Sequence, residues 1–371
     1  MKRGVSNHSK LSFSIILLIM GYFSCFSQNM KVFADSISND FLNDNKNYGL
    51  AVGILDEENK KMYYYGGKTC TDGNDIDSLS IFEIGSVTKL YTGYIFAALE
   101  KDRKLSRYNL VSKYLPSTIT KNKNWADKIR LIDLATHTSG LPGFDSTREL
   151  QTIDGFDEND PFGLFTNTFM LNILKETDSI LNYGKVVYSN FGIGLLGLSL
   201  EQITNQSFDE LLIRYIINPF HLKSTYSHLD EKNIINLAIP HRGKEAKPLI
   251  QLAKLEASGI LKTSLPDLLT FLEHHLYPEN TQQNEIVASV LENQLKESDT
   301  RVGIGWGIHT ILGETVYFHN GGTYGSSSVV IIVPKFKIGI AILANSIDGG
   351  KLTSYAISFV EKMIKEKSKN R

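Results

Sequence analysis

The sequence has little cysteine, little excess charge and few long apolar runs, and each shortage removes a class of protein. Only two cysteines, Cys25 and Cys70, occur in 371 residues, which excludes a scaffold held by several disulfides. The 39 basic and 40 acidic side chains give a formal net charge of −1. Because no basic stripe alternates with aromatic residues, we expect no nucleic-acid partner. With 371 residues the chain can bury a large core.

Several common catalytic motifs are also missing. No H-E-x-x-H occurs, and no serine lies between two glycines at two-residue spacing, so neither a zinc protease motif nor an α/β-hydrolase nucleophile turn is present. His274 and His275 have no third ligand at a useful spacing. The string Gly192-x-Gly194-x-x-Gly197 matches a dinucleotide fingerprint, but helical patterns follow it where a second parallel strand is required. We therefore predict no metal and no cofactor.

The one notable apolar run lies at the N-terminus. A basic start precedes Leu11–Phe26, and a small-x-small signature ends at Ser27. This pattern predicts a signal peptide over residues 1–27, cleaved between Ser27 and Gln28, and a periplasmic or secreted protein. The run is too short to predict a stable membrane span. The alternative is a lipoprotein acylated on Cys25, which the preceding residues favour less. After cleavage at Ser27, Cys70 would be the only cysteine.

A serine and a lysine three residues apart form the first candidate site. Ser86 and Lys89 make the only S-x-x-K, between a short apolar stretch ending at Gly85 and the apolar segment Leu90–Leu99. Residues three apart share a helix face, a buried lysine loses its charge easily, and such an amine can activate a serine. A helix N-terminus also stabilises an oxyanion. The alternative is a helix-capping serine followed by a surface lysine.

Two later motifs add polar groups of the kinds that acyl transfer requires. Tyr188 and Asn190 form the only Y-x-N, in a loop before an apolar helix, and can move a proton and hold a carbonyl. His319-Asn320-Gly321-Gly322 ends a strand at two glycines, where a substrate can approach the backbone. The alternatives are a core tyrosine with a capping asparagine, and a hairpin turn. A second H-x-G, His241-Arg242-Gly243, lies in a loop-like stretch, so His319 is preferred.

In this order, S-x-x-K, Y-x-N and H-x-G resemble the motifs of the serine penicillin-recognising enzymes: class C β-lactamases, D-Ala-D-Ala carboxypeptidases and related esterases. The stretches 134–142, 257–268 and 303–307 resemble the same family, so the similarity extends from about residue 48 to 345. The resemblance implies that Ser86 is the acylated nucleophile and Lys89 its partner. Tyr188 would be a general acid/base and Asn190 a substrate-positioning amide. The backbone N–H groups of Ser86 and Gly322 would form the oxyanion hole.

The departures from the family concern specificity. The β-lactamases of this family usually carry K-T-G, which is missing here, and His319 stands in place of its lysine. A histidine near its reference pKa of about 6.5 is mostly neutral at pH 7. We therefore expect weak recognition of β-lactam carboxylates, and better activity on anionic substrates as the pH falls toward 6.5. Carboxypeptidases with H-x-G usually have an arginine on the preceding strand, where this chain reads Gly307–Thr310.

The distribution of patterns predicts an α+β fold of the β-lactamase/transpeptidase type. Strands are expected over 49–55 and 61–65 and again over 316–318, 327–333 and 338–344, with a final helix over 352–364. One antiparallel sheet would thus be built from both chain ends and flanked by helices. Residues 28–371 would form a single catalytic domain, with 28–101 and 241–371 as its α/β part and 102–240 as a mainly helical insertion.

These observations predict an exported serine hydrolase that works through an acyl-enzyme on Ser86. We expect a D-Ala-D-Ala carboxypeptidase-like peptidase or an esterase, with weak β-lactam hydrolysis. Its partner would be a small-molecule or peptide substrate: a cell-wall peptide, an ester or a β-lactam. The alternatives are a true class C-like β-lactamase and a non-catalytic domain that binds penicillin or senses peptidoglycan. Such a domain usually lacks one member of the catalytic set, whereas here Ser86, Lys89, Tyr188 and His319 are all present.

Overall fold

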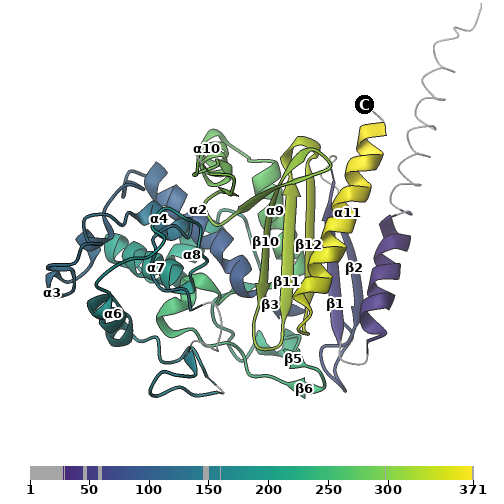
Figure 1. The fold of residues 1–371 in the computed structure, drawn as a ribbon. Helices are drawn as coiled ribbons and strands as arrows, with labels where there is room; N and C mark the ends of the chain where they lie inside the picture. Colours follow the sequence, from purple (N-terminus) through teal and green to yellow (C-terminus); the bar gives the residue numbers. More distant parts are fainter. Residues whose placement is uncertain are drawn as a thin grey trace, which may run out of the picture.

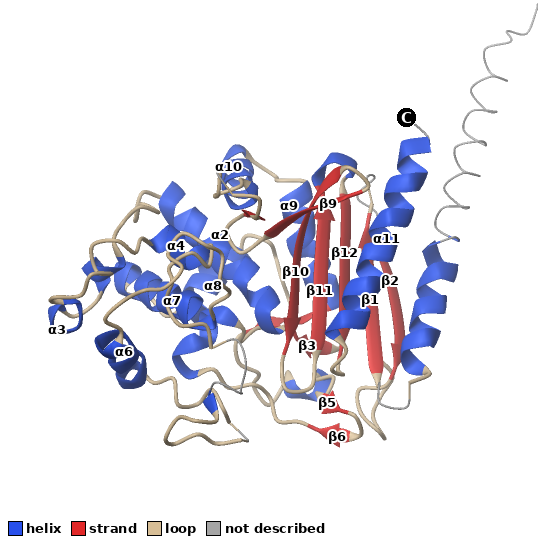
Figure 2. Cartoon of the chain, viewed as in Figure 1, coloured by secondary structure: helices blue, strands red, loops and turns tan. Residues whose placement is uncertain are grey.

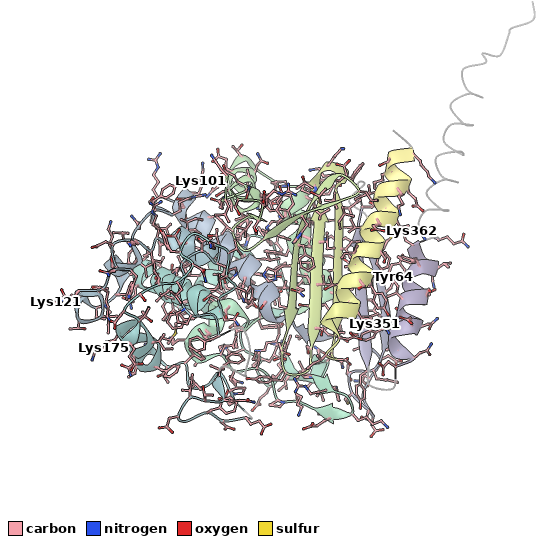
Figure 3. All side chains as sticks on the ribbon, in the orientation of Figure 1. Tyr64, Lys101, Lys121, Lys175, Lys351 and Lys362 are labelled. Atoms are coloured by element: carbon pink, nitrogen blue, oxygen red, sulfur yellow. The ribbon has the colours of Figure 1, made fainter. Side chains whose placement is uncertain are left out.

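The computed structural model of the chain describes residues 28, 30–44, 48–56, 61–144, 150–158, 160–296 and 298–369. A sheet covered by helices lies beside a mainly helical half (Figure 1). The predicted signal peptide, and Cys25 with it, falls outside the described residues. Within them, every helix is too short or too polar to span a bilayer. The labelled lysines are spread over the outside of both halves, from Lys121 near α3 to Lys362 on α11 (Figure 3).

One antiparallel sheet joins the two ends of the chain (Figure 2). Its strand order is β2-β1-β12-β11-β10-β9-β8, so the first two strands lie beside the last ones. Leu50 of β1 is opposite Ala344 of β12. This arrangement confirms the predicted fold class. The strands are β1 (Gly49–Leu55), β2 (Lys61–Gly67), β8 (Arg301–Val302), β9 (Gly307–Ile311), β10 (Glu314–Gly322), β11 (Ser327–Val333) and β12 (Ile338–Ala344).

Both faces of the central strands are buried, which explains their nearly continuous apolar sequences. Along β12, Ile340 and Ile342 belong to a core shared with α11 (Gly349–Lys369) and the helix over 30–42. Their neighbours Ala341 and Leu343 belong to the other core, where α9 (Leu265–Leu276) contacts β1 and β12. Alternate side chains of a strand point to opposite faces, so helices are needed on both sides of the sheet.

The helical half is formed by the middle of the chain. Its α-helices are α3 (Ser117–Thr120), α4 (Leu131–Ala135), α6 (Asn167–Glu176), α7 (Asn190–Thr204) and α8 (Phe208–Leu212), with short turns η2 (Val111–Tyr114), η3 (Ile213–Ile217) and η4 (Ile234–Asn236). The one strand among the described residues of 102–240 is β4 (Thr225–Tyr226). It was not predicted, because two residues are too few to show an alternating pattern. The insertion boundaries at 102 and 240 remain our proposal.

The segment that carries the S-x-x-K motif lies between the two halves. Strand β3 (Ile81–Glu83), which pairs with β7 (Lys262–Ser264), leads through the turn η1 (Gly85–Val87) into α2 (Thr88–Lys101). Every side chain of α2 from Thr88 to Leu99 is buried. Helix α2 contacts α8, α10 (Thr281–Leu291) and η5 (Ala253–Ser258). The motif therefore lies on an element fixed by packing on all sides.

Candidate active site

Ser86 lies in η1, directly before the N-terminus of α2. The turn is attached to the large sheet, since Ser328 Oγ of β11 donates to the carbonyl of Ile84 at 2.7 Å. Gly85 has a φ of +46°, in the left-handed region that favours glycine. A Cβ at this position would lie 2.4 Å from the carbonyl oxygen of Gly322. The turn thus brings the Ser86 hydroxyl and N–H to the end of β10.

Lys89 has three oxygen atoms around its Nζ. These are Ser86 Oγ at 3.0 Å, Asn190 Oδ1 at 2.9 Å and the carbonyl oxygen of Ser258 at 2.6 Å. The side chain is 1% exposed, and this burial lowers the pKa of Lys89 well below its ordinary value. A lysine that gives up its proton easily can accept one from the serine hydroxyl it already contacts.

Tyr188 reaches the same serine from the helical half. Its Oη donates to Ser86 Oγ at 2.6 Å, and its ring centroid lies 4.9 Å from Lys89 Nζ. His137 packs against this ring, with centroids 4.6 Å apart, and its Nδ1 accepts the N–H of Ser189 at 3.1 Å. Burial lowers the pKa of His137 to about 3, so the imidazole is neutral and remains an acceptor. His137 therefore holds the loop that carries Tyr188 through both the ring contact and the hydrogen bond to Ser189.

Asn190 is the first residue of α7, which begins where Ser189 Oγ accepts the N–H of Gly192 at 2.8 Å. The side-chain amide of Asn190 both accepts and donates a hydrogen bond: its Oδ1 accepts from Lys89 Nζ, and its Nδ2 donates to the carbonyl of Phe144 at 2.8 Å. Asn190 also lines the cavity beside Ser86. The same side chain can therefore orient the lysine and meet a substrate.

The carbonyl of Ser258 was not identified from the sequence as part of the site. Every residue has such an oxygen, so no sequence signal could mark it. Its position depends on the close contact between α7 and η5. A Cβ on Gly194 would lie 2.5 Å from Leu255 Cδ2, and one on Gly197 would lie 2.5 Å from Ala257 Cβ. The glycines of the nucleotide-like string therefore allow helix packing at this point.

Gly321 and Gly322 end β10 beside the serine turn, but only one of them is enclosed. A Cβ on Gly321 would lie 2.0 Å from the Ile84 carbonyl oxygen and 2.9 Å from Ser86 N. A Cβ on Gly322 would meet nothing closer than the Ser326 carbonyl oxygen at 3.8 Å. The backbone of β10 can approach the nucleophile turn this closely only because residue 321 has no side chain.

We expect Gly321→Ala to lower turnover by on the order of 100-fold or more, because the added methyl group must push the turn away from β10. Gly322→Ala keeps its N–H and should stay within about tenfold of wild type. Chromogenic ester hydrolysis, with circular dichroism as a check of folding, measures both effects. Gly350→Ala, which adds a methyl group in open space, is the control. Equal activities of Gly321→Ala and Gly322→Ala would contradict this account of the turn.

His319 lies on β10 and is buried. Its Nδ1 is 2.6 Å from the carbonyl oxygen of Asn320, so Nδ1 carries the proton and Nε2 is an acceptor in the neutral ring. Burial, reinforced by the charge of Lys89, lowers the pKa of His319 to about 4. This burial argues against the expected pH response near 6.5, which assumed a solvated imidazole. The ring is neutral above about pH 4.

Two cavities meet at Tyr188. The first has a volume of about 320 Å³ and is lined by Gly85, Ser86, Phe162, Tyr188, Asn190, Arg242, Ile250, Leu252, Leu255, Ser258, Gly259, Gly322, Thr323 and Tyr324. The second, of about 260 Å³, is lined by Ala135, His137, Val186, Tyr188, Thr300, Arg301, Val302, Gly305, Trp306, Gly307, His309, Phe318, His319 and Asn320. Of the site residues predicted from the sequence, Ser86, Asn190 and Gly322 line the first cavity, His319 lines the second and Tyr188 lines both. The arginines Arg242 and Arg301, one in each, were not predicted.

Comparisons with known proteins agree with this arrangement. The family model described as Beta-lactamase matches residues 26–357. A curated "Beta-lactamase" of Yersinia enterocolitica is 22% identical over 335 residues, which is 80% of this chain and 82% of that protein. "Protein flp" of Staphylococcus aureus (strain MW2) is 24% identical over 276 residues, 71% of this chain. The match covers 52% of the length of that protein.

Solved structures share the fold. A class C beta lactamase from Rhodobacter sphaeroides superimposes with a TM-score of 0.76 at 20% identity, covering 90% of this chain and 99% of the other. A beta-lactamase from Sulfitobacter sp. EE-36 gives a TM-score of 0.78 at 20% identity, covering 93% and 99% of the two chains. At this identity the likeness concerns the fold alone.

Proposed function

The chain belongs to the beta-lactamase family of serine hydrolases, and from that premise we propose that it is an exported enzyme acting through an acyl-enzyme on Ser86. It would be a D-Ala-D-Ala carboxypeptidase-like peptidase or an esterase that hydrolyses β-lactams weakly. One observation carries the proposal: Lys89 Nζ and Tyr188 Oη both contact Ser86 Oγ, at 3.0 Å and 2.6 Å.

Export has its own test. Mass spectrometry of the secreted protein should identify Gln28 as its first residue, and a secreted chain that still begins at Met1 would contradict cleavage.

Acylation follows from these contacts. Lys89 takes the proton of the Ser86 hydroxyl as Oγ attacks the substrate carbonyl carbon. The carbonyl oxygen becomes an oxyanion, and the N–H groups of Ser86 and Gly322 stabilise it; preorganised donors of this kind usually contribute most to acyl transfer. The carbonyl then re-forms, the bond to the leaving group breaks, and Tyr188 supplies a proton to the departing atom. The proton that Lys89 took from Ser86 then passes to Tyr188, so that both groups return to their starting states. Water repeats the sequence on the acyl-enzyme and releases the acid.

The two cavities suit the two parts of such a substrate. The first holds Ser86 and Gly322, so it takes the carbonyl and the acyl group. The second shares only Tyr188 with the first among their described lining residues, and Tyr188 is the group that protonates the leaving atom, so the second takes the leaving group. Arg301 of β8 lines this second cavity and donates to Thr310 Oγ1 at 2.7 Å. It offers a cation for a C-terminal carboxylate in place of the arginine that the preceding strand lacks.

A true class C-like β-lactamase remains the second candidate, favoured by the names of the Yersinia relative and the solved structures. The neutral His319 argues against it, since a permanent cation is missing where the family's lysine would stand. The non-catalytic sensor is less well supported. A protein that only binds its ligand has no need of a buried lysine and a tyrosine hydroxyl on the same serine oxygen.

A substrate panel separates these functions: a D-Ala-D-Ala peptide, nitrocefin and short-chain nitrophenyl esters, each measured from pH 5 to 8. We expect the peptide or the esters to be turned over at least tenfold faster than nitrocefin, roughly the factor that one well-placed cation supplies. Nitrocefin turned over fastest would favour the β-lactamase, and no turnover of any substrate would favour the sensor.

Adding an anionic ester and its neutral analogue to this panel tests the state of His319. Protonation would add a positive charge below its pKa, and that pKa is about 4. The ratio of activities on an anionic ester and its neutral analogue should therefore stay flat from pH 8 to 5. The ratio cancels any titration of the general base, which affects both substrates. A rise in the ratio centred near pH 6.5 would mean that the imidazole is solvated and ionises in the accessible range.

A further inference from the structure

We propose that Arg242 makes the first cavity a site for acyl groups that end in a carboxylate. The inference rests on the proposed hydrolase function and adds the substrate class. Arg242 belongs to the H-R-G sequence that was set aside in favour of His319. It is the second residue of β5 (His241–Arg242), which forms a hairpin with β6 (Glu245–Ala246). The hairpin lies below the end of the large sheet (Figure 1).

The chemistry of the cavity points to an acyl chain with one distant charge. Among the described residues that line it, Arg242 is the only one with a charged side chain. Much of the remaining wall is apolar or aromatic, formed by Phe162, Ile250, Leu252, Leu255 and Tyr324. Such a wall receives the methylene groups of an acyl chain, while a guanidinium binds a carboxylate through two parallel N–H donors.

Arg242 is exposed, yet its backbone is fixed. The preceding residue, His241, is 2% exposed and stacks on Tyr48 with ring centroids 3.9 Å apart. The N–H of His241 lies 2.8 Å from the carbonyl oxygen of Gly325 and 3.1 Å from that of Asn345. Gly325 belongs to the turn that follows Gly322, so the arginine is attached to the same loop as the proposed oxyanion hole. Its side chain therefore starts from a defined point at the cavity wall.

The positive charge has no carboxylate partner among the described residues. Glu245, which pairs with Arg242 in the hairpin register, is 2.6 Å from Lys247 Nζ. Burial raises the pKa of Tyr324, and the charges of two other acids, Asp160 and Glu83, raise it further, but neither acid lines the cavity. Glu83 is 1% exposed and accepts from Thr323 Oγ1 at 2.6 Å and from the N–H of Ile250 at 2.7 Å. Arg242 is thus left to bind a ligand.

Paired esters test the inference. Nitrophenyl monoesters of dicarboxylic acids of increasing length would be compared with the same compounds capped as neutral methyl esters. The leaving group is constant and only the far end of the acyl chain changes. We expect Arg242→Ala to lower kcat/KM about tenfold for the carboxylate series at its best chain length, with the neutral series unchanged. Arg242→Lys should retain part of the preference, and added salt should reduce it in the wild type.

Two control variants locate the charge. Arg214→Ala removes an equal charge from an exposed position outside both cavities and should not change the ratio between the series. Arg301→Ala affects the leaving-group cavity, so it should also keep this ratio. The inference would be overturned if Arg242→Ala lowered kcat/KM equally for both series, or lowered it for neither. It would also be overturned if Arg301→Ala removed the preference for the carboxylate series. None of these outcomes would contradict the proposed hydrolase function. If the wild type cleaves neither series, the proposed function fails, and this inference fails with it.

Discussion

Replacing Ser86 by alanine is expected to reduce turnover by on the order of 10⁴-fold or more, because the group that forms the covalent intermediate is lost. The change removes only the oxygen that Lys89 and Tyr188 contact. The backbone N–H at residue 86 stays, so folding and substrate affinity should be largely retained. Wild-type protein treated with a fluorescent penicillin or a fluorophosphonate should carry one adduct, and peptide mapping should assign it to Ser86.

The control for this experiment is Ser358→Ala, which changes an exposed serine of α11. It should label and turn over as the wild type does. An adduct on a different serine, or labelling that persists in Ser86→Ala, would show that the S-x-x-K serine is only a turn residue. The outcome with the fluorophosphonate is independent of the natural substrate, because this probe reacts with activated serines in general.

Loss of Lys89 or Tyr188 is expected to be nearly as severe, and the two losses should not multiply. Lys89→Ala and Tyr188→Phe should each lower kcat by about 10²- to 10⁴-fold, the range for a lost general acid or base. Both groups contact one oxygen, Ser86 Oγ, so after the first loss the second has little left to remove. The double variant should therefore be little worse than the poorer single one.

Two further variants separate chemistry from stability. Lys89→Met keeps an apolar stem in the buried position and should be as inactive as Lys89→Ala, although better packed. Tyr183→Phe removes a hydroxyl from the loop that leads to Tyr188; this hydroxyl contacts Asp133 and the carbonyl of Lys128, far from the serine. It should remain active. Losses that multiply in the double variant would indicate two independent roles in place of a shared proton network.

The sequence predicted the parts of this molecule whose signal lies in consecutive residues. The sheet strands were predictable because alternate or continuous apolar residues mark them, as in the buried β11 and β12. The spacing of Ser86 and Lys89 predicted their contact, since it follows from one helical turn. The contact of Tyr188 with Ser86 bridges 102 positions. It followed from the family resemblance and could not have come from local spacing.

The remainder depends on tertiary packing. The short strands β4 and β8 have two residues each, too few for a pattern. The pKa of His319 could not be foreseen, because its low value of about 4 comes from burial beside Lys89. The sequence around Arg242 predicted a loop and gave no sign of a site. Only the folded hairpin brings it to the cavity wall, where its neighbour His241 contacts Gly325 and Asn345.

The joining of the first and last strands has a consequence for how the chain folds. The N–H of Tyr48 donates to Ser346 Oγ at 3.1 Å across 298 positions, and β12 lies between β1 and β11. Closing so long a loop is entropically costly, and topologies rich in distant contacts fold slowly. The sheet therefore cannot be completed during synthesis until the last strand has left the ribosome. A premature stop before residue 338 would leave the β1–β2 hairpin without β12, the strand that joins it to the rest of the sheet.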